Sequence, residues 1–133
     1  GRRSIYLKVS IMAPSKFLLS FNFPDPKLPT GRRDVTNVPS QALVLLNDPF
    51  VVSLADQWAG RLVAEKHPTP EARIEQMFVR ALGRSPQMEE SKRWTGFARG
   101  LSDGGTVQLM ADRVAWKNVA HTLLNIKEFI HFR

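Results

Sequence analysis

The sequence predicts a mainly α-helical protein, an antiparallel bundle of about four to five helices preceded by an extended N-terminal arm with one short strand. Two observations predict this fold. After residue 38, apolar residues recur at the i, i+3, i+4 spacing that places them on one face of a helix. Three prolines follow helix-capping residues, and the loops between the periodic segments are short.

The length and composition are those of one folded domain. The chain has 133 residues, of which 43% are hydrophobic, and no Cys. A chain of this length buries roughly two-thirds of its unfolded surface. The longest apolar run, Ala42 to Leu46, is far shorter than the about 20 residues of a membrane span, so a spanning segment is excluded. The lack of Cys excludes a disulfide framework, a thiolate zinc site and a Cys-x-x-Cys-His haem site in this sequence.

The predicted organisation is an arm followed by a bundle. We assign residues 1–38 to the extended basic arm and Pro-rich loop, and residues 39–133 to the helical bundle, within one domain. The chain begins at Gly1 without an initiating Met or a signal-peptide pattern. We therefore expect it to be a fragment of a longer protein.

Positive charge is concentrated near the N-terminus. Residues 1–47 contain seven basic and two acidic residues, whereas residues 48–133 contain twelve and ten. A basic arm binds acidic surfaces or polymers by releasing their counterions. We favour an acidic surface of upstream domains of the same protein over an anionic polymer, and both over nucleic acid.

The first 38 residues give two local predictions before a loop. Side chains alternate in character from Ser4 to Ile11, which predicts a short half-buried strand. Its partner strand lies in this chain or in another module, because one strand cannot stand alone. A short helix is predicted after Pro14-Ser15, and the prolines of residues 24–38 predict an extended loop.

The remaining helices are placed by their capping residues. Helix starts are predicted at Asp48-Pro49, Thr69-Pro70 and Ser85-Pro86. The expected helices are Pro39 to Leu46, Pro49 to about Lys66, Pro70 to Leu82 with Gly83 as its C′ residue, Pro86 to Ser102, and a last helix capped by Thr106 and continuing to Ile130. Asn47-Asp48-Pro49 is expected to kink or break the chain between the first two. The three Trp residues are interpreted as core anchors.

The densest polar cluster is a candidate anion or ligand site. Arg32 and Arg33 lie in the loop before the Pro39 helix, and Gln41 lies in its first turn. Loop arginines beside a helix N-terminus direct N–H groups toward an anion. The alternative, which we favour, is that these groups satisfy the backbone of the loop.

A second candidate cluster lies on the last predicted helix. His121, Asn125 and Glu128 are spaced i, i+4 and i+7, which places them on one helix face. Such a face could relay a proton, but it supplies an incomplete ligand set, so no metal site is predicted. A solvated polar face is the favoured interpretation. His67 and His131 lack partners in sequence and are expected at the surface.

No complete catalytic motif is present in the sequence. It contains no Gly-x-Ser-x-Gly, no phosphate-binding glycine loop and no His-Glu-x-x-His. No catalytic residue is therefore assigned.

Several segments together resemble one family. The most specific is Pro-x-Gln-Ala-Leu-x-Leu-Leu-Asn-Asp-Pro-Phe, which begins at Pro39. The others are Arg2–Tyr6, Phe21–Asp25, Arg32–Leu43, Leu45–Val51, Ala81–Pro86 and His121–Phe129. With these segments the chain resembles the C-terminal part of the planctomycete-specific domain of unknown function.

The resemblance implies a location and neighbours rather than a mechanism. It implies an exported protein, periplasmic or cell-surface associated, whose upstream module can carry c-type haem. No cofactor is expected within this sequence, and no catalytic residue transfers from the family.

Two functions from different classes follow. The first is a non-catalytic helical assembly module that packs on upstream domains. The alternative is a ligand-binding or catalytic domain that uses the Arg-rich loop on an acidic or sulfated polysaccharide. It predicts a pocket where Arg32, Arg33 and Gln41 meet His121 or Glu128.

Overall fold

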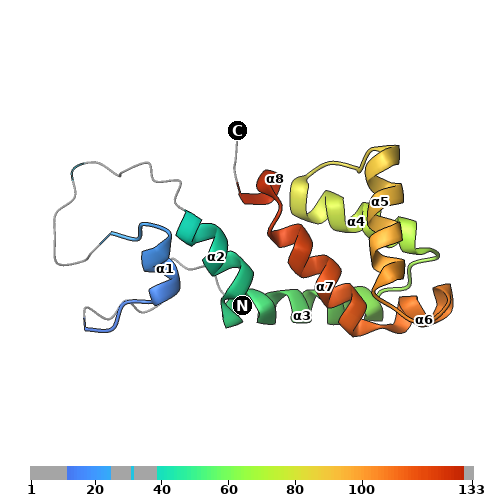
Figure 1. The fold of residues 1–133 in the computed structure, drawn as a ribbon, viewed down its shortest axis with the longest axis horizontal. Helices are drawn as coiled ribbons and strands as arrows, with labels where there is room; N and C mark the ends of the chain where they lie inside the picture. Colours follow the sequence, from blue (N-terminus) through green and yellow to red (C-terminus); the bar gives the residue numbers. More distant parts are fainter. Residues whose placement is uncertain (1–11, 25–30, 32–38, 131–133) are drawn as a thin grey trace. The chain divides into compact units, whose positions relative to one another are not determined.

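The structure is a computed structural model that describes residues 12–24, 31 and 39–130. Every regular element in these ranges is a helix, which confirms the mainly α-helical prediction (Figure 1). The helices are α1 (Lys16–Ser20), α2 (Pro39–Asn47), α3 (Pro49–Ala64), α4 (Pro70–Leu82), α5 (Met88–Gly100), α6 (Thr106–Ala111), α7 (Arg113–Leu124) and α8 (Lys127–Ile130). The strand predicted from Ser4 to Ile11 lies outside the described residues, as does most of the loop predicted over 24–38.

The chain divides into two compact units, Gly1–Asp48 and Pro49–Arg133. The first contains α1 and α2, which contact each other, and the second contains α3 to α8. The expected break at Asp48 is confirmed, because Asp48 is the one non-helical residue between α2 and α3. The arm predicted over residues 1–38 stays a prediction.

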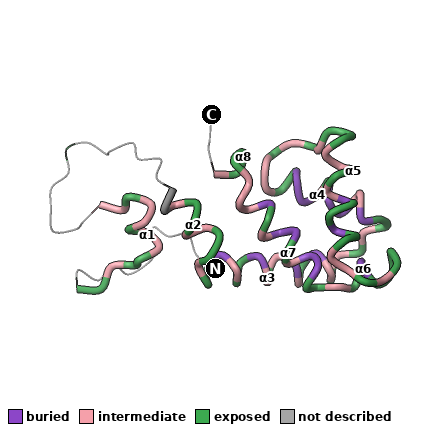
Figure 2. The backbone as a smooth tube through the Cα atoms, viewed as in Figure 1, coloured by how far each residue is buried: buried purple, intermediate pink, exposed green. Residues whose placement is uncertain are grey.

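The core of the second unit lies between α3, α4, α5 and α7 (Figure 2). The contact of α3 with α7 is the most extensive, and α4 packs mainly on α5. Small buried side chains, Ala59 on α3 and Ala120 on α7, are compatible with close approach of helices. The buried cluster comprises Ala55, Ala59, Leu62, Ile74, Met77, Phe78, Ala98, Leu109, Ala115, Trp116, Val119, Ala120 and Leu123.

The Trp residues contribute unequally to this core. Trp116 is completely buried, whereas Trp58 and Trp94 are partly buried against the same cluster. The rings of Phe78 and Trp94 meet edge to face with centres 5.6 Å apart, and Trp94 meets Phe97 at 6.1 Å. Because Phe97 is 40% exposed, the predicted apolar stripe of α5 continues from the core onto the surface.

Local capping explains the bounds of α4. Thr69 Oγ1 accepts a hydrogen bond from Ala72 N at 3.2 Å, and Pro70 occupies the first helical position. At the other end Gly83 has a φ of 70°, the left-handed conformation that glycine adopts without strain. The predicted α4 is therefore confirmed at both ends.

The predicted start of α5 was wrong by two residues. The helix begins at Met88 instead of Pro86, with Gln87 as its N-cap. Ser85, expected to cap the helix, instead directs its hydroxyl to Glu75 Oε1 at 3.3 Å. The start is fixed by Gln87 N, which donates to Glu90 Oε2 at 2.8 Å.

The last predicted helix was also wrong, because three helices occupy its range. Asp112 has a ψ of 92°, which interrupts the helix, and its Oδ1 accepts from Val114 N and Ala115 N at 3.0 Å each. Asp112 therefore ends α6 and caps α7. Thr106 is the first helical residue of α6 rather than its cap.

Candidate functional site

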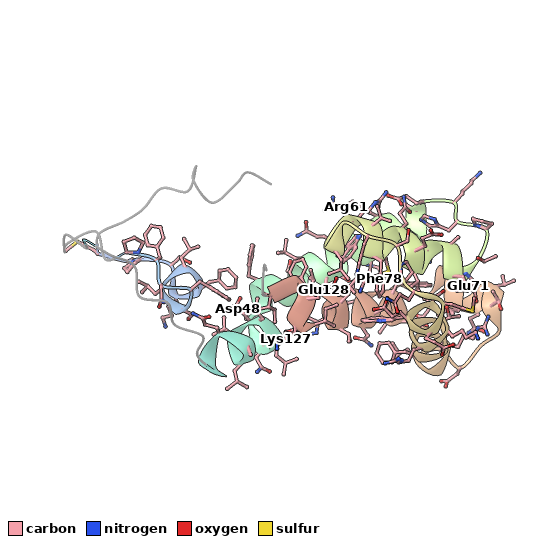
Figure 3. The ribbon with its side chains drawn as sticks, turned by 90° about the horizontal axis from the view of Figure 1, so that it is seen from above. Asp48, Arg61, Glu71, Phe78, Lys127 and Glu128 are labelled. Atoms are coloured by element: carbon pink, nitrogen blue, oxygen red, sulfur yellow. The ribbon has the colours of Figure 1, made fainter. Side chains whose placement is uncertain are left out.

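Arg84 connects three helices of the second unit. It follows Gly83, where the chain leaves α4. Its Nη1 and Nη2 donate to the two oxygens of Glu90 at 2.8 and 2.9 Å, and its Nε and Nη2 donate to Glu128 at 2.6 and 2.7 Å. The guanidinium carbon lies 5.6 Å from the ring centre of Phe78 (Figure 3 labels Phe78 and Glu128). Arg84 thereby joins the end of α4 to the first turn of α5 and to α8.

The charges in this cluster stabilise one another. Hydrogen bonds from Arg84 and from the Gln87 backbone lower the pKa of Glu90 to about 2. The same bonds from Glu90 and Glu128 raise the pKa of Arg84. A carboxylate and a guanidinium that stay ionised across the neutral range do not exchange protons there. The cluster can hold helices together, but these two groups are poorly suited to acid–base catalysis.

The structure separates two members of the predicted polar face from the third. Asn125 Nδ2 donates to the backbone oxygen of His121 at 2.8 Å, so these residues are neighbours. Glu128 lies on α8 and pairs with Arg84. Because α7 ends at Leu124, the helical spacing assumed for the three residues does not extend to Glu128. His121 Nε2 is buried and has no hydrogen-bond partner in the described parts of the chain.

Of the three residues of the predicted anion site, the structure describes Gln41. Gln41 lies in α2 and is partly exposed. Arg32 and Arg33 lie outside the described residues. A ligand role for these three residues, or for His121, Asn125 and Glu128, stays a prediction.

A hollow of about 320 Å³ lies beside the end of α3, the first turns of α4, and α6. On its wall Glu65 accepts from Arg80 Nη1 at 2.8 Å and lies 3.2 Å from His67 Nε2. Arg80, with a smaller contribution from His67, lowers the pKa of Glu65. The His67 side chain is only 11% exposed, so its expected surface position was wrong. Sequence reasoning missed this hollow, because its residues come from separate elements.

A second hollow, of about 330 Å³, lies between α5 and α7. It is lined by the aromatic side chains of Trp94 and Phe97 together with Arg93 and Thr122. It could accommodate an apolar side chain or a flat ring.

Within the described ranges, no three His, Asp or Glu side chains gather closely enough to hold a metal ion. No helix in the same ranges combines the length and apolar character that crossing a membrane requires.

Comparison with known protein families shows which family the chain is related to. Residues 1–98 match the family described as PSD1, a protein of unknown function (DUF1553). The chain belongs to the PSD1 family. No curated protein and no solved structure gives a significant match. In this PSD1 chain the match includes Arg32, Arg33 and Gln41 and ends within α5, so His121, Asn125 and Glu128 lie beyond it.

Proposed function

We propose that this PSD1 chain is a non-catalytic helical module that assembles with other modules of a larger exported protein. The observation that carries the proposal is the exposure of the residues described in its first unit. None of the residues described in 12–24 and 41–48 is buried, although many are large and apolar (Figure 2). Apolar side chains that their own unit leaves in water are stabilised by packing on a partner.

Within the first unit, both short helices carry exposed large apolar side chains. Leu43 and Leu46 on α2 are 59% and 50% exposed, and Leu19 on α1 is 40% exposed. On α1, Phe17 and Phe21 pair with ring centres 5.0 Å apart, but both remain partly exposed. Burying one such side chain contributes about 1.5–3 kcal/mol, so a few of them are enough to drive specific docking.

The partner we propose is an upstream module with an acidic border around an apolar surface. This choice rests on charge, because residues 1–47 carry seven basic and two acidic residues. In the same proposal Ser4 to Ile11 adds a strand to a sheet of that module, and the helices of the second unit form an antiparallel bundle. The protein would be an exported planctomycete protein with this module at its C-terminus, and an upstream module would carry c-type haem.

Hydrogen exchange tests the proposal directly. The native-length protein and the 133-residue chain are compared at the amides of residues 41–47. We expect exchange there to be at least about tenfold slower in the native-length protein, while α7 exchanges equally in both. Equal exchange at residues 41–47 contradicts the proposal. Protection that rises with the concentration of the 133-residue chain alone also contradicts it, because it indicates self-association.

A matched pair of double variants shows which surface docks. Leu43→Ser with Leu46→Ser should remove most of the protection in the native-length protein. Val107→Ser with Val114→Ser is the control, because these residues are 87% and 67% exposed in the second unit. Equal protection in the two double variants would mean that α2 is not the docking surface.

A further inference from the structure

The hollow beside α3, α4 and α6 contains a buried arginine. Arg73 is 2% exposed, yet it lines this hollow of about 320 Å³. Its Nη1 donates to the backbone oxygen of Met110 at 2.9 Å, and its guanidinium carbon lies 4.7 Å from the ring centre of Trp116. The side chain is thus held in place by one neutral acceptor and an aromatic face.

This arginine is only partly compensated by negative charge, because the Glu65 carboxylate raises its pKa less than burial lowers it. Its Nε is buried and has no hydrogen-bond partner among the described residues, and no carboxylate there forms an ion pair with it. Burial lowers the pKa of Arg73, which reflects the cost of keeping its charge away from water. A guanidinium nevertheless stays charged in proteins. A buried cation with an unsatisfied donor is stabilised by any anion that reaches it.

Glu65, the acidic side chain that lines the hollow, already has positively charged or hydrogen-bonding neighbours. The two oxygens of Glu65 face Arg80 and His67, at 2.8 and 3.2 Å. Lys66 adds a second positive charge to the lining and forms no ion pair in the described part of the chain. The hollow therefore presents more positive than negative charge to a ligand.

The lining also limits what kind of anion fits. Val63, Val107, Met110 and Ala111 supply its apolar part, and Glu65, Lys66, His67 and Arg73 supply its polar part. A carboxylate with a short apolar chain can satisfy both parts, whereas inorganic phosphate would leave the apolar part unused. Small-molecule sites have volumes from about 300 Å³ upward, so the volume of this hollow lies near the lower limit.

We propose that this hollow binds a small monocarboxylate, with Arg73 hydrogen-bonded to the carboxylate, Lys66 as a second cation and the apolar chain against Val63 and Met110. This site is independent of the assembly function proposed above, because all its residues belong to the second unit. It assigns a binding role to Arg73, which the sequence patterns did not single out.

Titration with butyrate tests the proposal. The probe is sodium butyrate at constant ionic strength, followed by NMR at the Arg73 Nε–H and at the amides of residues 65–67. We expect saturable shifts with butyrate and at least about tenfold weaker binding of butyramide, its neutral analogue, and of inorganic phosphate. Absence of a saturable shift overturns the proposal. Equal binding of butyramide overturns the proposal as well, because the site would then recognise only the apolar chain. Equal binding of phosphate also overturns it, because the site would then recognise only negative charge.

A matched lysine pair tests the site without disturbing the core. Lys66→Gln should weaken butyrate binding about threefold. Lys92→Gln removes the same charge from a side chain that is 68% exposed on α5, and it should leave binding unchanged. Equal effects of the two substitutions would show that only net charge matters and would overturn the proposed site. Arg73→Met should abolish the shifts, with folding checked by circular dichroism, and the lysine pair decides the matter if that variant fails to fold.

Discussion

Arg84 and Glu128 are 44 residues apart in the sequence and are joined by two hydrogen bonds of 2.6 and 2.7 Å. Glu128 belongs to α8, which has four residues. A helix this short is not stable by itself, so it depends on contacts with the rest of the unit. The pair with Arg84 and the packing of Ile126 against the core supply such contacts.

Replacing Arg84 should therefore loosen α8 and lower stability. We expect Arg84→Met to reduce the free energy of unfolding by about 1–2 kcal/mol, because two partly exposed ion pairs are lost together. The measurement is urea unfolding followed by Trp fluorescence, with hydrogen exchange at residues 127–130. These amides should exchange faster in the variant.

The control for Arg84 is another arginine of the second unit. Arg61 lies on the exposed side of α3 (Figure 3), and Arg61→Met should change stability by less than about 0.5 kcal/mol. Similar losses for both variants would mean that the Arg84 cluster does not hold α8 in place.

The pKa of Glu90 predicts a dependence of stability on pH. Its folded pKa is about 2, below the ordinary value of 4.5, so folding favours the ionised form. The resulting stability is complete above pH 4.5 and is lost as the pH falls through about 2. A shift of this size would contribute roughly 3 kcal/mol, which solvent screening of partly exposed groups reduces to about 1 kcal/mol.

Comparison of two neighbouring carboxylates checks this effect. Glu90→Gln should show a shallower fall in the free energy of unfolding between pH 4.5 and pH 2 than the unchanged protein. Glu89→Gln is the control, because its side chain is 76% exposed in the same turn. The assignment to Glu90 is wrong if both variants follow the unchanged protein. The measurement is urea unfolding at several pH values across this range.

Elements with signals at both ends were predictable from sequence. For α4, Thr69 and Pro70 determine the start and Gly83 determines the end, and all three act through the adjacent backbone. The start of α5 was less predictable, because a distant partner competes for its expected cap. The Ser85 hydroxyl donates a hydrogen bond to Glu75, and Gln87 is the N-cap residue instead.

The candidate sites were less predictable, because their partners are distant in sequence. Arg73 is adjacent to the predicted apolar stripe of α4, and its contacts with Met110 and Trp116 come from α6 and α7. Periodicity identifies the face of a helix that is buried, but it does not show that a charged neighbour will be buried too. For the same reason, the helical spacing of His121 and Glu128 did not reveal the pairing of Glu128 with Arg84.

Two glycines should respond oppositely to the same substitution. Gly83→Ala forces a side chain into a φ of 70°, which costs about 1 kcal/mol or more. Gly96 lies within α5, and an added Cβ meets nothing within 4 Å. Gly96→Ala should therefore stabilise the protein by roughly 0.5–1 kcal/mol. Thermal unfolding followed by circular dichroism measures both, and changes of the same sign would contradict the backbone conformations described here.

The division between α6 and α7 depends on the side chain of Asp112. Its Oδ1 accepts from Val114 N and Ala115 N, so Asp112→Ala leaves two helix-terminal donors without this acceptor. We expect a loss of about 1 kcal/mol in urea unfolding and faster exchange of those two amides. Asp103→Ala is the control, because this substitution removes the same charge from an exposed residue of the preceding turn. Since Trp116 follows within the first turn of α7 and its Nε1 donates to Leu109 O at 2.7 Å, loosening this junction should also shift Trp fluorescence. If the two variants unfold alike, the junction is held by the Trp116 contact rather than by the cap.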